Sequence, residues 1–326
     1  LQIKRINNNK DKFVKKNENE IGDSAEGYFG VKDVLLENFD NYKNKLLFVS
    51  SLNYIVDKDC YNLSVFLAEI INVDKFEISE WKNIFSSKEC LNINLTNKPK
   101  FAAASAGGRI SKLDGENILL SIGDFYADGQ HGPILSQDIS NDYGKILKIN
   151  ISDYSYKIFS LGHRNPQGLY VDKHNNIFST EHGPDGGDEL NFVIEDQNYG
   201  WPIATFGTEY GMKVWPKDQT NNTHNNFQKP IFSWGNQFGI SNLIVYENAY
   251  FKKWNQNLIV SSLATQKLAR MIFDDKNKSI IYIEYIPINK RIRDIIVLKN
   301  GKIALLTDSG IKKENGPEII LLDKVN

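Results

Sequence analysis

The sequence lacks several features that define common protein classes. It has only two cysteines, and neither stands in a C-x-x-C pair, which argues against a cysteine-based metal site. No apolar run approaches the roughly 18 residues of a transmembrane helix, so we expect no membrane span. The formal net charge of the 326 residues is −1, which argues against a general nucleic-acid or membrane-surface binder.

The sequence also lacks the short motifs of several large enzyme classes. It contains neither a P-loop nor a dinucleotide fingerprint, so hydride chemistry with a nicotinamide cofactor is not supported. A G-x-S-x-G nucleophile elbow and the spaced histidines of a zinc site are absent as well. No signal peptide is visible, and we expect a trimmed start because the opening "LQIKRI" resembles part of a folded segment.

The two cysteines, Cys60 and Cys90, flank a strand-like run. A disulfide that clamps the ends of a β-hairpin is one interpretation, and two free buried thiols are the other. A disulfide would indicate an oxidising compartment, so the first interpretation predicts a periplasmic or secreted bacterial protein.

A recurring phrase is the strongest signal of organisation. An apolar run follows a turn residue and ends in small polar residues in five places: "NKLLFVSSL", "ENILLSIGD", "NNIFSTEHG", "QNLIVSSLA" and "GKIALLTDS". Such runs are typical of buried strands, and their repetition favours a radial array of β-sheets. Five copies and a truncated edge predict an all-β, six-bladed β-propeller. We find no linker and expect a single domain over residues 1–326.

Polar side chains are concentrated between residues 160 and 191, where loops of a propeller converge on one mouth. Arg164 provides a forked cation for carboxylates or carbonyls, and Asn165 adds a donor and an acceptor. The plainer interpretation is an ion pair of Arg164 with Asp185 or Asp188 that braces a turn. The following "EHGPDGGDELN" is rich in carboxylates and favours a hard cation, although its spacing matches no EF-hand loop.

A second basic cluster lies near the carboxyl end. Arg291 and Arg293 are two residues apart, so both point to the same face of a strand. Either this face is a solvated edge, or an anionic ligand with several carboxylates lies between the two guanidinium groups.

The motifs "LGHRNPQGLYVD", "STEHGPDGGDELNFV", "NYGWP" and "RIRDIIVLKNGKIALLTDS" together resemble the glucose/sorbosone dehydrogenase family. The resemblance covers roughly residues 100–310. It implies a six-bladed propeller that oxidises sugars with pyrroloquinoline quinone (PQQ). It further implies that Arg164 and Asn165 contact the quinone side of PQQ, that Arg291 and Arg293 grip its carboxylates, and that backbone carbonyls of Gly183 and Pro184 bind a calcium ion.

The chain departs from this family where a catalytic base is expected. The family has a histidine in a His-x-Gly-Gly-Arg segment, and this chain has "SAGGR", which places Ser105 at the catalytic position. A serine hydroxyl is a poor base near neutral pH unless a second base activates it. Tyr28 stands where a pocket glutamine is expected. His131 or His182 would have to replace the missing base.

These observations leave three hypotheses. The first is a PQQ- and calcium-dependent enzyme that oxidises an aldose at its anomeric carbon to a lactone, with a sugar and an electron acceptor as partners. The second is a propeller that binds PQQ, a sugar or another ligand without turnover. The third, a calcium-dependent lactonase-type hydrolase, is disfavoured because the carboxylates cluster in a single loop.

Overall fold

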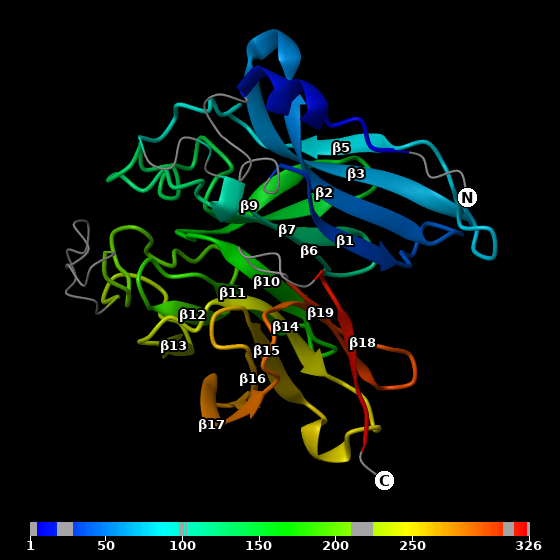
Figure 1. Cartoon of the computed structure of the whole chain (residues 1–326), viewed down its shortest axis with the longest axis vertical. Coiled ribbons are helices and arrows are strands. Elements are labelled where there is room, and N and C mark those ends of the chain that lie inside the picture. The colour runs from blue at the N-terminus through cyan, green and yellow to red at the C-terminus, as the bar shows by residue number, and fades with distance from the viewer. Residues whose placement is uncertain are drawn as a thin grey trace. The chain divides into compact units, whose positions relative to one another are not determined.

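The computed structural model describes residues 5–17, 29–97, 101, 103–209, 224–308 and 316–324. The chain divides into two compact units, residues 1–166 with 195–203 and residues 167–194 with 204–326. Each unit consists of antiparallel sheets (Figure 1). The expectation of a single domain over residues 1–326 stays a prediction. Within the described residues, no helix has the length and apolar character needed to cross a membrane.

The first unit contains two sheets whose strands follow one another in sequence. The first sheet has the order β1-β2-β3-β4, with β5 paired to β3, and the second has the order β6-β7-β8-β9. Their bounds are β1 Val31–Glu37, β2 Leu46–Ile55, β3 Cys60–Asn72, β4 Glu77–Ile78, β5 Lys82–Ser86, β6 Gly107–Lys112, β7 Asn117–Ile122, β8 Lys145–Asn150 and β9 Tyr156–Leu161. Short 3₁₀ turns, η1 Val56–Lys58 and η2 Ala103–Ser105, connect them, and residues 10–17 are helical.

The second unit contains three sheets of the same up-and-down type. Their orders are β10-β11-β12-β13, β14-β15-β16-β17 and β18-β19-β20. The strands are β10 Pro166–Val171, β11 Ile177–Glu181, β12 Asp188–Phe192, β13 Phe232–Trp234, β14 Ile240–Tyr246, β15 Asn257–Ser262, β16 Lys267–Asp274, β17 Ser279–Pro287, β18 Ile292–Val297, β19 Ile303–Thr307 and β20 Ile319–Leu322. One further 3₁₀ turn, η3, spans Lys252–Trp254.

The five repeated phrases form β2, β7, β11, β15 and β19, and each is the second strand of its sheet. These strands are buried along nearly their whole length, which explains their continuous apolar runs. Adjacent sheets within a unit contact each other through their first and second strands, β1 with β6, β11 with β14, and β14 with β18. The all-β propeller class is therefore confirmed.

The predicted number of six blades is wrong for the described residues, which form five sheets. The physical reason lies in the repeat itself. One buried second strand specifies one sheet, so five phrases correspond to five blades. The truncated sheet edge that we counted as a sixth blade does not form a separate sheet among the described residues.

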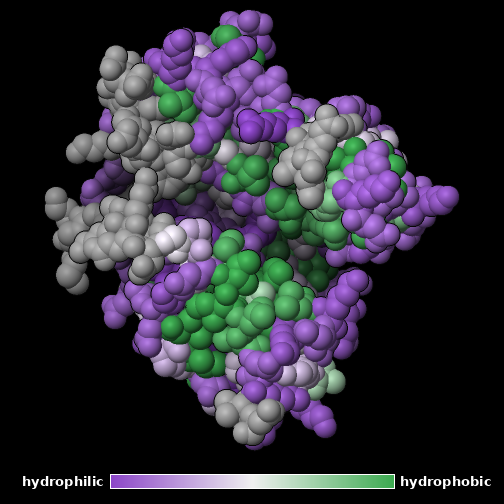
Figure 2. Space-filling model, turned by 45° about the vertical axis from the view of Figure 1, so that its right-hand side comes forward, coloured by the Kyte–Doolittle hydropathy of each residue, from purple (hydrophilic) through white to green (hydrophobic). Residues whose placement is uncertain are grey.

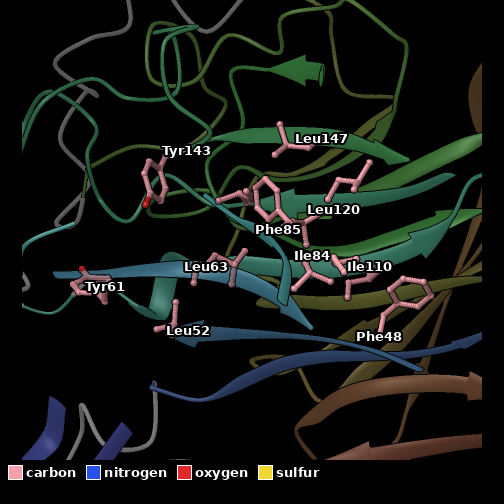
Figure 3. Close-up of a cluster of buried hydrophobic side chains, with 14 of the residues drawn as sticks. Phe48, Leu52, Tyr61, Leu63, Ile84, Phe85, Ile110, Leu120, Tyr143 and Leu147 are labelled. Carbon is pink, nitrogen blue, oxygen red and sulfur yellow. The ribbon is translucent and has the colours of Figure 1, made fainter. Parts of the chain in front are cut away.

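The core of the first unit lies between its two sheets. Figure 3 shows its buried side chains, among them Phe48, Leu63 and Phe85 from the first sheet and Leu120 and Leu147 from the second. The second unit has its own apolar clusters, built on β14, β15 and β18. Apolar side chains also gather at the surface (Figure 2), and in the last sheet Ile296, Leu306, Ile319 and Leu321 are exposed.

A disulfide joins Cys60 and Cys90, with Cα atoms 5.5 Å apart. It ties the start of β3 to the segment that follows β5, and these two strands are paired in the same sheet. The interpretation of one disulfide clamping a hairpin is confirmed, and the alternative of two free thiols is wrong.

Candidate functional site

Ser105, the residue at the expected base position, lies at the end of η2 and is 1% exposed. Its hydroxyl donates a hydrogen bond to Asp124 Oδ1 at 2.7 Å. Its backbone carbonyl accepts a hydrogen bond from the Phe125 N–H at 3.1 Å. Ser105 is therefore a buried donor that holds a carboxylate in place.

Asp124 follows β7 at the end of a repeated phrase and is completely buried. Its carboxylate also accepts hydrogen bonds from the Trp201 indole N–H at 2.7 Å and the Tyr126 backbone N–H at 2.9 Å. Burial raises the pKa of Asp124 to about 6, while the nearby charge of Arg164 opposes the rise. The sequence reasoning missed this residue, although a carboxylate that closes an apolar strand could have revealed it.

Arg164 lies against the same group of residues and is only 7% exposed. Its guanidinium carbon is 5.2 Å from the ring centre of Trp201 and 5.6 Å from that of Tyr126, within the range of cation–π attraction. The backbone carbonyl of Arg164 accepts a hydrogen bond from the Asp124 N–H at 2.8 Å. We call Ser105, Asp124, Arg164 and Trp201 the Asp124 cluster.

The suggested turn partners of Arg164 have other bonds. Asp185 accepts a hydrogen bond from Gln237 Nε2 at 2.6 Å. Asp188 accepts two backbone N–H groups, that of Gly183 at 3.0 Å and that of Gly239 at 2.6 Å. These carboxylates brace loops of the second unit, whereas Arg164 belongs to the first.

Asn165 uses its amide to shape the segment that carries Ser105. Its Oδ1 accepts a hydrogen bond from the Gly107 N–H at 3.2 Å, and its Nδ2 donates to the Ala104 carbonyl at 3.3 Å. Asn165 is 5% exposed. Within the first unit, its clearest role is to position the turn at Ser105.

Two further motifs hold Trp201 in the cluster. Gln137 and Asn198 exchange amide hydrogen bonds at 3.1 and 2.7 Å. The Trp201 carbonyl accepts hydrogen bonds from Ser136 Oγ at 2.7 Å and Gln137 Nε2 at 2.6 Å. The "LSQD" segment therefore fixes the "NYGWP" segment, and through it the indole that binds Asp124.

The second basic pair lies at the start of β18 in the second unit. Arg293 forms an ion pair with Asp308 and donates a hydrogen bond to Gln167 Oε1 at 3.3 Å. Arg291 Nη1 donates to the Leu263 carbonyl at 3.3 Å. Arg291 Nε is buried and has no hydrogen-bond partner in the part of the chain that the structure describes. The Arg293 guanidinium is thus paired with a carboxylate, whereas the Nε–H of Arg291 donates no hydrogen bond to the described residues.

The predicted calcium ligands, Gly183 and Pro184, lie in the loop that joins β11 to β12. Asp188 holds this loop through the Gly183 N–H, as described above. No group of three or more His, Cys, Asp or Glu side chains among the described residues is arranged to hold a metal ion. A site made of backbone carbonyls requires no such group, so the calcium site stays a prediction.

Three buried polar residues lie at the ends of the same two strands. The Asn191 amide donates a hydrogen bond to Glu181 Oε1 at 2.9 Å and to Glu189 Oε2 at 3.4 Å. Burial, together with the charge of Glu181, raises the pKa of Glu189 well above its ordinary value. The prediction that the carboxylates cluster in a single loop is therefore wrong for Glu181 and Glu189, which lie on the paired strands β11 and β12. Tyr28, the other departure from the family pattern, lies outside the described residues.

Comparisons with known proteins agree with these motifs. The family model for glucose/sorbosone dehydrogenase matches residues 3–317. The Escherichia coli aldose sugar dehydrogenase YliI is 28% identical over 226 residues, which cover 64% of this chain and 59% of that protein. The matched region spans about three fifths of the length of two curated relatives, 59% in each case.

Solved structures share the fold. A glucose dehydrogenase crystal structure matches with a TM-score of 0.75 at 22% identity, covering 91% of this chain and 84% of that one. The PQQ-bound aldose sugar dehydrogenase of Streptomyces coelicolor matches with a TM-score of 0.63 at 19% identity, covering 90% and 80%. The family model covers nearly the whole chain, and the chain therefore belongs to the glucose/sorbosone dehydrogenase family.

Proposed function

We propose that the chain oxidises an aldose at its anomeric carbon to a lactone, with PQQ as the oxidant and an external electron acceptor. Family membership supports the reaction class, as does the similarity to an aldose sugar dehydrogenase and to a PQQ-bound one. The observation that carries the proposal is the buried, unpartnered Nε of Arg291. A buried guanidinium donor without an acceptor is costly, and a ligand carboxylate would satisfy it.

The residues at β18 fit a cofactor with several carboxylates. Arg291 would hold one carboxylate through its unused donor, and Arg293 would hold another by sharing its guanidinium with Asp308. In the same unit, backbone carbonyls of Gly183 and Pro184 would hold the calcium ion. When bound, PQQ supplies a two-electron oxidant for the sugar.

A second candidate function is ligand binding without turnover. The buried hydrogen bond from Ser105 to Asp124 favours it, because a hydroxyl that donates to a carboxylate and is 1% exposed does not act on a sugar. This candidate predicts PQQ binding with no reduction of the bound cofactor by any aldose.

A titration of the purified chain with PQQ and calcium, followed by absorbance, tests cofactor binding. We expect saturable binding that Arg291→Ala weakens about tenfold to a hundredfold, since a hydrogen bond to a charged group contributes about 1.5–3 kcal/mol. Arg270→Ala is the matched control, because Arg270 pairs with Glu284 on β17 of the same unit. Equal affinities in the two variants would contradict the proposed carboxylate site.

Turnover with aldoses and an artificial electron acceptor then separates the two functions. Oxidation above the rate of Arg164→Ala supports the dehydrogenase. Binding without turnover supports the second candidate, and omission of calcium tests the proposed metal.

We also propose a periplasmic or secreted location, which the disulfide supports because such bonds persist in oxidising compartments. Fractionation of the producing cell tests this, and recovery of the protein in the cytoplasm with reduced cysteines would contradict it.

A further inference from the structure

The Asp124 cluster lacks an accessible base at the position where the family resemblance expects one. Ser105 donates its hydroxyl proton to Asp124, and both residues are buried. Asp124 already accepts hydrogen bonds from Trp201 and from the Tyr126 backbone. A sugar hydroxyl can reach neither group, so the base must be another residue.

The chain has five histidines, and three of them have clear structural positions. His163 is fully buried, shares a hydrogen bond with Ser160 and stacks on Tyr199. His224 is buried and stacks on Phe206, with ring centres 4.5 Å apart. His174 lies exposed in a turn of the second unit. His131 and His182 remain.

His131 has the geometry of an oriented base. Its Nδ1 lies 2.9 Å from Asp128 Oδ2, and the Asp128 side chain is 3% exposed while that of His131 is 25% exposed. The other oxygen of Asp128 accepts the backbone N–H groups of Gln130 and His131, each at 2.9 Å. A carboxylate held in this way binds the Nδ1–H and leaves Nε2 as the acceptor. His182 also faces a carboxylate, and its Nδ1 lies 3.8 Å from Asp188 Oδ1, a longer separation than that between His131 and Asp128.

The loop that carries His131 begins in the Asp124 cluster. Tyr126 lies against the Arg164 guanidinium, and the Ala127 N–H donates to the Asp124 carbonyl at 2.9 Å. Asp128 is near enough for its charge to contribute to the raised pKa of Asp124. These interactions tie the start of the His131 loop to the Asp124 cluster within one unit.

We infer that His131 is the catalytic base of this chain and that Asp128 is its positioning residue. The inference rests on the proposed function. His131 Nε2 takes the proton of the anomeric hydroxyl as the C1–O double bond of the lactone forms. A bound PQQ would supply the oxidant that accepts the hydrogen of the C1–H bond together with its electron pair. The sugar loses two electrons and two hydrogens, and the imidazole carries the proton as imidazolium.

Substitution of His131 tests the inference in the PQQ- and calcium-loaded protein. We expect His131→Ala to lower kcat by about 10²–10⁴-fold with unchanged PQQ affinity, since general-base catalysis contributes that factor. Added imidazole should restore part of the rate, which loss of a purely structural side chain would not allow. Asp128→Asn should lower kcat with KM unchanged, and His174→Ala, the exposed control, should behave as wild type.

Nitrogen-15 NMR of labelled histidine provides a readout independent of turnover. We expect neutral His131 to carry its proton on Nδ1, and Asp128→Asn to mix the two tautomers. An Nε2–H tautomer in the wild type overturns the inference, as does a His131→Ala rate equal to wild type. PQQ binding without any wild-type turnover overturns it as well, while absence of PQQ binding overturns the proposed function itself and this inference with it.

Discussion

Asp124 shows how a single buried carboxylate can organise a site. It receives hydrogen bonds from Ser105, Trp201 and the backbone of Tyr126, and it lies within the field of Arg164. Its partners come from segments as far as 77 residues away. Burial nevertheless outweighs these favourable interactions, so its pKa stays raised.

This pKa predicts a pH-dependent stability. The folded chain keeps Asp124 protonated up to a pH of about 6, whereas the unfolded chain ionises it near its ordinary value of 3.8. The folded state therefore binds more protons in this window, and its stability falls as pH rises from about 4 to about 6. A pKa difference of about two corresponds to about 3 kcal/mol.

Urea unfolding of wild type and Asp124→Asn at several pH values measures this contribution. The variant should show a smaller fall between pH 4 and 6 than wild type, because burial also raises the pKa values of Asp142 and Glu189. Asp74→Asn, an exposed turn control, should keep the wild-type fall. Identical profiles for wild type and Asp124→Asn would show that Asp124 does not titrate in this window.

At the residue scale, the sequence indicated notable charged residues but not the contacts that they make. Arg164 was singled out in a polar loop and Arg291 by its spacing from Arg293. In the structure Arg164 lies against the Trp201 ring, and Arg291 donates to the Leu263 carbonyl. Asp124 and Trp201 were missed because their bond joins segments that no local pattern relates. The pairing of Arg293 with Asp308 needed the register of β18 against β19, which residue types alone do not specify.

At the scale of elements the recurring phrases were highly informative. Each phrase predicted one buried strand, and all five became second strands of sheets. The class of fold followed from them, since a continuous apolar run bounded by turns is typical of a strand covered on both faces. The predicted number of blades was wrong because we counted a sixth blade that no complete phrase supported.

Two neighbouring leucines of β19 test this account of burial. Leu305 is fully buried, whereas Leu306 is 42% exposed on the opposite face. We expect Leu305→Ala to cost about 2–5 kcal/mol of unfolding free energy, because it leaves a cavity in a packed core. Leu306→Ala should change it by about 0.5 kcal/mol or less. Chemical denaturation measures both, and equal losses would mean that β19 does not present one face to the core.

At the scale of the whole molecule, the two compact units differ in how they are held. The first contains the disulfide, which closes a segment of 30 residues across β3 and β5. Restricting a loop of this length in the unfolded chain stabilises the folded chain by about 3–4 kcal/mol in the chain-entropy model. The second unit contains neither cysteine and depends on its apolar clusters.

Removal of the disulfide should therefore act on one unit. We expect the double variant Cys60→Ala and Cys90→Ala to lower the melting temperature and to speed amide hydrogen exchange in β3 and β5. The strands β14 to β16 of the other unit should keep their protection. Mass-spectrometric hydrogen exchange measures this strand by strand, and a uniform increase over both units would contradict it.

Trp201 adds a practical property to the site. Its indole N–H is bonded to Asp124 and its ring lies against Arg164. Because the excited state of an indole responds to nearby charge, we expect the fluorescence of Trp201 to change when Asp124 is protonated or when an anion displaces Arg164. Trp201, one of the five tryptophans in the chain, is therefore an intrinsic fluorescence probe of the Asp124 cluster.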